Sequence, residues 1–405
     1  MNTTNRKRIY ILAFTLVVIM LGFGMIMPIF PFYVEEMGAG GFELGLLMAS
    51  YAITRLIFAP IWGRLSDHIG RKPVLMLGVF GYGLAMVMFG LATNLWMLFV
   101  ARILSGILSS ATSPTTMAYV SDSTSAEERG GGMGILGAAM GLGMILGPGL
   151  GGLLGAESIS MPFFLAAGMC VLSLGLIYLF LPESLPEEAR TQAKKTSSST
   201  GYREIRDMII GPAGILFFLI FLANTGIMTF YSIFGLYALE KYGFGTEQVG
   251  LIMTVVGLAS AIAQGLLTGF LTKRWGEATV IKISLICSSI GFAAMITAGT
   301  YLAIFLSIGF FALAIALLVP AITALISKLE NIEQGILMGL SNSFMSAGRV
   351  IGPIWGGFVY DIQIEYPYIS GVVIFVFGFI ASLLWIKPSP DQGRIKISFG
   401  DSHEN

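Results

Sequence analysis

Long apolar stretches alternate with short polar segments along the whole chain, and this pattern predicts membrane-spanning helices. A helix needs about 20 mostly apolar residues to cross the hydrocarbon core of a bilayer. Stretches of suitable length and few charges occur at residues 9–33, 45–62, 73–91, 95–119, 130–155 and 161–181, and again at 213–239, 249–272, 280–299, 301–327, 335–360 and 367–386. The pattern therefore predicts an all-α integral membrane protein with about twelve transmembrane helices.

The two sets of six stretches also share a sequence repeat. Residues 147–152, Gly-Pro-Gly-Leu-Gly-Gly, return 205 residues later as Gly-Pro-Ile-Trp-Gly-Gly at 352–357, and Gly130 and Gly134 have counterparts at the same spacing. Parallel repeats of membrane halves are typical of secondary transporters. We therefore expect two pseudo-symmetric six-helix bundles, at residues 1–181 and 213–405, joined by a polar cytoplasmic linker at 182–212.

Composition excludes most other classes of protein. Hydrophobic residues make up 55% of the chain and charged residues 11%, with a mean hydropathy of +0.83, so the bilayer rather than water is the expected solvent. The two histidines and two cysteines do not form a catalytic relay, a disulfide framework or a metal cluster, and no phosphate-binding loop is present. We expect neither an enzyme nor a cofactor, metal or nucleic-acid partner.

The distribution of Lys and Arg predicts how the chain is oriented. If the N-terminus is inside, the loops on the opposite side of the membrane hold only Lys241, and all other loop cations lie on the cytoplasmic side. Cytoplasmic loops retain positive charge. We therefore expect a multi-pass protein of the cell (inner) membrane with both termini cytoplasmic. Its expected partners are the lipid bilayer, a small-molecule substrate and protons, and it is expected to act as a monomer.

Local motifs now indicate a family. Residues 63–73, Gly-Arg-Leu-Ser-Asp-His-Ile-Gly-Arg-Lys-Pro, resemble the signature loop of the major facilitator superfamily, except that His68 replaces the usual Arg or Lys. Arg102 with Gly106 resembles the second motif of that superfamily. The glycines and proline of the fifth stretch resemble the motif of its antiporters: Gly137, Gly141, Gly147, Pro148, Gly151 and Gly152. The whole chain resembles the twelve-helix drug:proton antiporters of the Bmr/NorA type, which implies export of drug-like compounds by alternating access and proton antiport.

The resemblance suggests residues that control the conformational change. Gly63 and Gly70 permit a tight turn, and Asp67 is expected to meet the positive end of the eleventh helix and latch the outward-facing state. Arg71 and Lys72 are interpreted mainly as topology signals. Small residues and a proline allow close approach and kinking in both halves, at Gly147, Pro148, Gly151, Gly352 and Pro353, which suits both plain packing and a seal against leak.

Arginine is the main ionisable residue within the apolar stretches. Such residues are costly and are functional by default, and here they are Arg55, Arg102 and Arg349, with no Asp or Glu in the middle of any stretch. Cation pumps of the family commonly carry acids in helices seven and ten. Three buried positive charges would instead favour neutral, zwitterionic or anionic amphiphiles. Arg55 and Arg349 are the preferred substrate contacts, whereas Arg102 suits a structural role equally well.

The rest of a substrate cavity would consist of aromatic, methionine and amide side chains. The candidates are Met25, Phe30, Tyr33, Tyr51, Met117, Tyr119, Asn224, Phe230, Tyr231, Gln264, Asn342 and Phe344. For an individual Phe or Met, packing is the commoner role, whereas amides in hydrocarbon need partners. Proton coupling would fall to carboxylates at helix ends, with Asp67 and Asp122 preferred.

The sequence is also compatible with two alternative functions. The first is export of an endogenous anionic metabolite such as a siderophore, or of a lipid or sugar. The second is a membrane sensor that has the same fold but does not transport.

Overall fold

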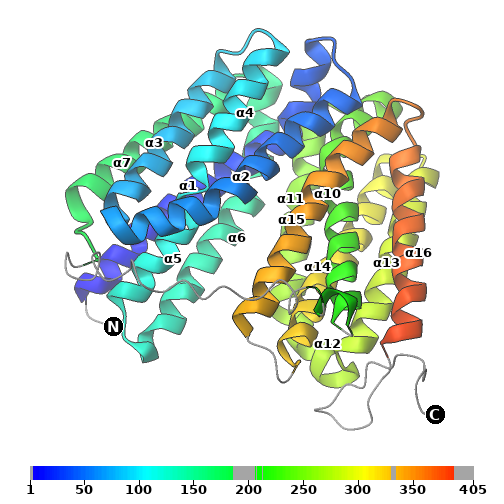
Figure 1. Ribbon diagram of the computed structural model, residues 1–405. Coiled ribbons are helices and arrows are strands. Elements are labelled where there is room, and N and C mark those ends of the chain that lie inside the picture. The colour runs from blue at the N-terminus through cyan, green and yellow to red at the C-terminus, as the bar shows by residue number, and fades with distance from the viewer. Residues whose placement is uncertain (1–2, 186–205, 207, 212, 330–333, 387–405) are drawn as a thin grey trace, which may run out of the picture. The chain divides into compact units, whose positions relative to one another are not determined.

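The computed structural model describes residues 3–185, 206, 208–211, 213–329 and 334–386, and this part of the chain is helical, without strands (Figure 1). The helices of the first half are α1 (Thr3–Glu36), α2 (Gly41–Ile69), α3 (Arg71–Gly90), α4 (Leu95–Ser109), α5 (Thr112–Ser123), α6 (Ala126–Glu157) and α7 (Met161–Phe180). Those of the second half are α10 (Gly214–Tyr242), α11 (Thr246–Ile262), the π-helix η2 (Ala263–Leu267), α12 (Thr268–Trp275), α13 (Glu277–Thr297), α14 (Tyr301–Ser327), α15 (Gln334–Tyr360) and α16 (Tyr366–Trp385).

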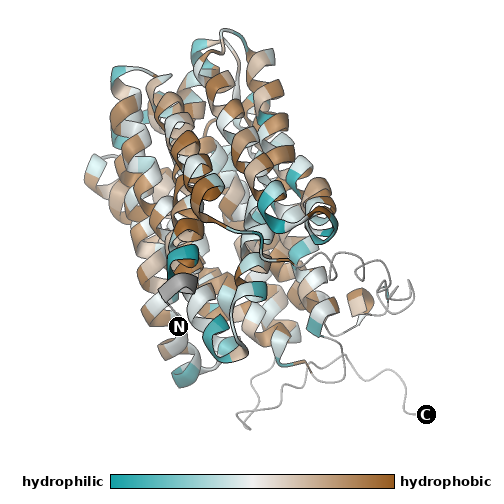
Figure 2. Ribbon diagram, turned by 90° about the vertical axis from the view of Figure 1, so that its left-hand side faces the viewer, coloured by the Kyte–Doolittle hydropathy of each residue, from teal (hydrophilic) through white to brown (hydrophobic). Residues whose placement is uncertain are grey.

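Most of these helices are long and apolar enough to cross a membrane. Eleven spans in the described residues meet both criteria, with α4 and α5 forming one span and α11, η2 and α12 another. Figure 2 shows hydrophobic residues along most of the helix lengths. The twelfth expected span is α15, which has 27 residues but is not among the eleven. Its sequence contains Asn342, Ser343, Ser346 and Arg349, so one part of this helix is polar.

Two of the spans are interrupted for identifiable reasons. Between α4 and α5 the chain turns at Ser110 and Ala111. Pro114 follows four residues after Ser110, and a proline removes the hydrogen bond to the carbonyl at that distance and clashes with it. In the other span, η2 is a short π-helix in which Thr268 Oγ1 donates to the Ala263 carbonyl at 3.0 Å. Such π-bulges occur frequently at functional sites.

The turns of the two halves repeat as the helices do. The glycines with positive φ in the described residues are Gly38 (72°), Gly70 (105°), Gly243 (66°) and Gly276 (77°). They form two pairs, 205 and 206 residues apart. Because side chains disfavour this backbone conformation, glycine specifies the turn in each case. The repeat therefore encodes the connections between helices as well as the helices.

Packing divides the chain into two compact units, which are described separately. The first contains residues 1–197 and 234–254, and the second contains residues 198–233 and 255–405. The expected bundle boundaries at 181 and 213 stay predictions, and most of the linker lies outside the described residues. In the first unit α1 packs against α6 and α7, and α3 packs against α4 and α7; in the second, α13 packs against α14 and α16.

Glycines of α6 allow α1 to pack closely against it. A Cβ added at Gly147 would lie 2.6 Å from the Leu21 carbonyl oxygen, and one at Gly151 would lie 2.6 Å from the carbonyl oxygen of Met25. The second unit has the same arrangement between α10 and α15. A Cβ at Gly348 would lie 2.7 Å from the Phe221 carbonyl oxygen. The repeated glycine motif thus produces the same helix contact twice.

Candidate functional site

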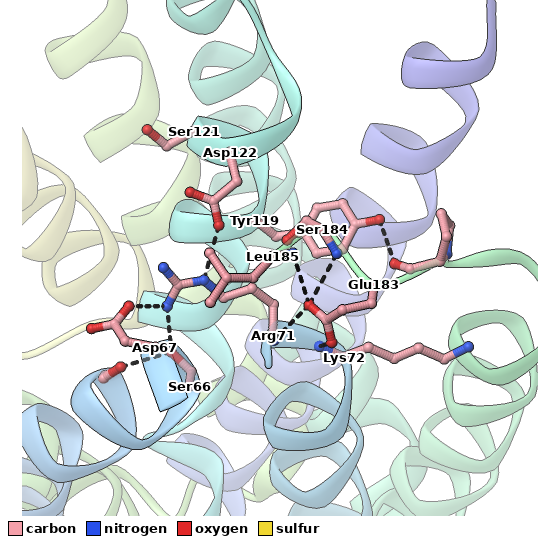
Figure 3. A network of polar contacts seen from close by, with 12 residues as sticks. Ser66, Asp67, Arg71, Lys72, Tyr119, Ser121, Asp122, Glu183, Ser184 and Leu185 are labelled. Atoms are coloured by element: carbon pink, nitrogen blue, oxygen red, sulfur yellow. Dashed lines mark hydrogen bonds and ion pairs between the residues drawn. The ribbon is translucent and has the colours of Figure 1, made fainter. Parts of the chain in front are cut away.

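The first polar cluster surrounds Arg71, the first residue of α3, and we call it the Arg71 network. The Arg71 side chain is buried, and its Nη1 lies 2.6 Å from Asp67 Oδ1 and donates to Ser66 Oγ at 2.6 Å. Its Nε donates to Asp122 Oδ2 at 3.0 Å (Figure 3). One guanidinium therefore joins α2, α3 and α5. Arg71 thus has a structural role in addition to the topology signal expected from the sequence, and its effect on topology stays a prediction.

Glu183 completes the Arg71 network, although the sequence did not single it out. Its carboxylate accepts the backbone N–H groups of Arg71 at 2.8 Å and Lys72 at 3.1 Å, and also those of Ser184 and Leu185 (Figure 3). The first N–H groups of a helix lack partners within the helix, so Glu183 caps α3 from the segment that follows α7. The acid directly after Pro182, at the end of an apolar stretch, was the available signal.

Two other features hold this segment against the bundle. Tyr119 Oη donates to the Pro182 carbonyl at 2.7 Å, and Lys72 Nζ donates to the Tyr178 carbonyl at 2.9 Å. Tyr119, expected as a cavity residue, is thus buried with its hydroxyl bonded to backbone. The end of α7 is therefore connected to both α3 and α5.

The second unit contains a charge-reversed counterpart of this ion pair. Glu277 is the first residue of α13, and its Oε1 lies 2.7 Å from Lys328 Nζ, at the end of α14. Both residues stand 206 positions after Arg71 and Asp122. The two halves therefore keep the link between these elements but exchange the signs of the charges.

The exchange matters because a helix has a positive N-terminal end and a negative C-terminal end. Glu277 and Lys328 match the ends of their helices, whereas Arg71 and Asp122 oppose theirs. In the first unit, each charge of the pair has the same sign as the helix end at which it lies, which is unfavourable; Asp67 and the cap from Glu183 offset this. In the second unit, each charge is opposite in sign to its helix end, so the dipoles stabilise the pair directly.

A second cluster lies inside the first unit, around Arg102 of α4. This side chain is 2% exposed, and its guanidinium lies 4.6 Å from the ring centroid of Tyr51, 5.0 Å from that of Phe30 and 5.9 Å from that of Phe23. Its Nη2 approaches Met48 Sδ at 3.4 Å. Nε and Nη1 have no hydrogen-bond partner among the described residues. Arg102 is therefore a buried cation in an aromatic cage, which we call the Arg102 cage.

The aromatic rings compensate only part of the cost of burying this charge. Each well-placed ring contributes about 0.5–2 kcal/mol, while removing an ion from water costs several kcal/mol. Each unpaired buried donor adds about 1–3 kcal/mol. Rings interact with the charge but do not satisfy the N–H groups. The Arg102 cage therefore has a remaining requirement for an acceptor.

Tyr51 connects this cage to a second arginine. Its hydroxyl accepts a hydrogen bond from Arg55 Nη1 at 3.2 Å and lies 3.3 Å from Ser109 Oγ. Two cations of the first unit thus meet on one tyrosine. Arg55 is only half-buried, so its guanidinium is accessible from outside the cage.

Arg349 of α15 lies in a different environment. It is exposed, with Nη2 3.2 Å from Met345 Sδ. Within the protein itself Arg102 is buried, Arg55 is half-buried and Arg349 is exposed, and the expectation that all three lie within the membrane stays a prediction. Gly335, Gly339, Asn342 and Arg349 are all exposed and recur at intervals of four, three and seven residues, so they share one helix face.

The other expected cavity residues are distributed between packing and exposed positions. Met25, Phe30, Tyr33 and Phe230 are buried, and Tyr33 Oη donates to the carbonyls of Phe89 and Ala92. Asn224 is buried and donates to the Ile220 carbonyl, and Phe344 stacks on Phe217. Tyr231 is half-buried beside Phe230, and Met117, Gln264 and Asn342 are exposed.

Known proteins resemble this chain over nearly its whole length. Multidrug resistance protein 2 of Bacillus subtilis is 32% identical over 393 residues, which cover 96% of this chain and 98% of that protein. Multidrug resistance protein 1 of the same organism is 33% identical over 94% of this chain and 96% of its own length. Quinolone resistance protein NorA of Staphylococcus aureus is 26% identical over 93% of this chain and 96% of that protein.

Solved structures and a family model complete the comparison. A bacterial homologue of the lysosomal transporter Spinster matches 95% of this chain and 98% of its own with a TM-score of 0.78, at 13% identity, which shows the fold alone. The human organic anion transporter TETRAN matches 94% of this chain and all of its own, with a TM-score of 0.65 at 20% identity. The Major Facilitator Superfamily model matches residues 12–246 and 216–403. The chain is a multi-pass membrane protein that belongs to the major facilitator superfamily.

Proposed function

We propose that this protein is a secondary active transporter that exports small amphiphilic, drug-like compounds by alternating access. The observation that carries the proposal is the similarity over 96% of the chain to a protein named for multidrug resistance. The position of the arginines refines it. Arg55 and Arg349 present guanidinium groups that are not fully buried, on membrane helices that lack acids in their middle. Neutral, zwitterionic or anionic compounds therefore suit this protein better than cations.

Proton antiport is the coupling that we propose. Asp67 and Asp122 are the candidate carboxylates, and both contact the Arg71 guanidinium, so gain or loss of a proton at either would alter the Arg71 network. This network connects three helices of the first unit. Protonation of either carboxylate would therefore be linked to movement of these helices. We also propose that the protein acts as a monomer and that both termini lie in the cytoplasm.

Transport into proteoliposomes tests the proposal. Purified protein would be reconstituted, and uptake of three fluorescent compounds, one cationic, one neutral and one anionic, would be measured with and without an imposed pH gradient. We expect gradient-dependent uptake of the neutral and anionic compounds, abolished by a protonophore. Uptake that ignores the gradient would contradict antiport, and preferred uptake of the cation would contradict the proposed selectivity. If no compound were transported, the result would favour the alternative function of a membrane sensor that has the same fold but does not transport.

Export of an endogenous anionic metabolite is the second candidate. The same arginines favour it, and the same vesicles can test it. Saturable uptake of anionic compounds alone, without uptake of the neutral amphiphile, would support this narrower function over drug export.

A further inference from the structure

The Arg102 cage contains more hydrogen-bond donors than acceptors. Nε and Nη1 of Arg102 are unpartnered among the described residues although the side chain is 2% exposed. Buried polar groups are paired in the great majority of structures, and the exceptions often mark a bound water or ion. The unmet requirement is for an acceptor, and a negatively charged acceptor would also neutralise the guanidinium.

Two hydroxyl groups near Arg102 share this condition. Ser105 follows Arg102 by three residues, on the same face of α4, and its Oγ is buried without a partner among the described residues. Tyr82 of α3 has a buried hydroxyl that is unpartnered in the same sense, and it lies 2.8 Å from the position of a Cβ at Gly22, the residue before Phe23 of the Arg102 cage. Each hydroxyl can donate a hydrogen bond. Three residues from two helices therefore offer donors in one buried region.

The charges around this region are positive. Arg102 lies in it, and Arg55 reaches its edge through Tyr51. No Asp or Glu lies in the middle of the spans of the first unit. Because the ligand must approach a guanidinium that is almost fully buried, only a single small charged group is suitable, such as a halide ion or a carboxylate.

We propose that Arg102, Ser105 and Tyr82 form a binding site for one monovalent anion, either a chloride-sized halide or the carboxylate of a transported compound. The anion accepts hydrogen bonds from Arg102 Nε and Nη1 and from the two hydroxyls. Binding of the carboxylate of a transported compound rests on the proposed function, because it requires that the protein transports such compounds. A halide would bind whether or not the protein transports drugs, and its binding is measured without transport.

Thermal unfolding of the full-length protein in lipid nanodiscs tests this site. Sodium sulfate would be replaced by sodium chloride at constant ionic strength in one series, and by sodium benzoate in a second. We expect a saturable rise of the unfolding midpoint with at least one of these anions. A response to chloride alone identifies a halide site, and a response to benzoate identifies a carboxylate site.

Variants locate the effect at the Arg102 cage. Arg102→Gln is expected to weaken the apparent affinity for the anion about tenfold or more, because charge-assisted hydrogen bonds are lost. Arg274→Gln, which removes an exposed arginine in the other unit, is expected to respond as the wild type does. If Arg102→Gln does not fold, Tyr82→Phe, which removes only one hydroxyl, replaces it in the test. Its apparent affinity for the anion is expected to be several-fold lower than that of the wild type. Equal responses of the wild type and a folded Arg102→Gln or Tyr82→Phe protein, or no response to either anion, would overturn the proposal.

Discussion

Arg71 and Arg102 are both buried arginines of the first unit, yet their surroundings differ in kind. Arg71 has two carboxylates and a hydroxyl as hydrogen-bond partners, whereas Arg102 has three aromatic rings and a thioether. Carboxylates satisfy N–H groups and charge together, while rings compensate only charge. The first arginine is therefore a structural centre, and the second retains capacity for a ligand.

Glu183 gives the prediction at the scale of single residues. Glu183→Ala removes the acceptor of several backbone N–H groups at the start of α3 and should lower the free energy of unfolding by about 1–2 kcal/mol. Glu183→Gln keeps one oxygen acceptor and should lose about half as much. Thermal or denaturant unfolding of purified protein measures both. Glu157→Ala, at the C-terminal end of α6, is the control and should cost nothing; equal losses at both positions would contradict the capping role.

Some helices of this protein pack closely at glycine residues, where no side chain separates the two backbones. In α6, Gly147 and Gly151 face α1, while an added Cβ at Gly137 or Gly141 would meet no described atom within 4 Å. Substitutions of glycines on one helix should therefore have different effects on packing, although the spacing of these glycines in the sequence is similar. The antiporter-type motif combines a packing face with an open face.

This difference leads to a prediction for paired alanine variants. Gly147→Ala places a methyl group against the backbone of α1 and should destabilise the protein by about 1–3 kcal/mol, with reduced transport. Gly141→Ala should be neutral, or stabilise by up to about 1 kcal/mol because alanine favours the helix. Unfolding midpoints and vesicle uptake of the two variants provide the comparison. Similar losses for both would show that the open face is also occupied.

The charge-reversed ion pairs provide a second prediction at this scale. Lys328 is 45% exposed and its pair follows the helix dipoles, so Lys328→Ala should cost less than about 1 kcal/mol. Arg71→Ala leaves Asp67 and Asp122 without their shared cation and should cost about 2 kcal/mol or more, discounted because both carboxylates are partly exposed. Denaturant unfolding ranks the variants. A larger loss at Lys328 would contradict the dipole argument.

For the whole molecule, the proposed substrate selectivity rests on family membership together with charge placement. The relatives named for drug resistance align with this chain over nearly their whole length. The arginines within its spans, without acids in the middle of those spans, distinguish it from a transporter that binds cations through membrane carboxylates.

Selectivity is the prediction at this scale. Arg55→Gln or Arg349→Gln should reduce uptake of an anionic compound about tenfold more than uptake of a neutral one, which corresponds to about 1.4 kcal/mol of lost attraction. Arg274→Gln, near the end of α12, removes a charge outside the apolar stretches and is the control. The measurement is the ratio of anionic to neutral uptake by vesicles. An unchanged ratio would remove both arginines from substrate recognition.

Most of the helices, the turn at Gly70 and the superfamily are predictable without coordinates, because hydrophobic length and repeated glycines act locally along the chain. Gly63, expected in the same turn, lies inside α2, so that part of the prediction was wrong. The span at 335–360 is the least apolar of the twelve expected spans, since one face of α15 is polar. Hydropathy alone is therefore a weaker predictor of a membrane helix at this position. The assignment of Asp67 as a latch stays a prediction. Its contact with Arg71 joins residues four positions apart, whereas the contact of Arg71 with Asp122, 51 positions away, could not be anticipated from the motif.

Hydrophobic spacing and the 205-residue repeat determine a two-fold helical membrane protein, since the bilayer requires continuous apolar helices and the duplicated turn glycines keep the same positive φ. Packing in three dimensions decides the partners of the charges. Glu183 lies more than a hundred positions after Arg71, and Arg102 meets rings from α1 and α2, so neither relation appears in the linear pattern. A charge acts on whatever the fold brings within a few ångströms, and distance along the chain does not report that neighbour.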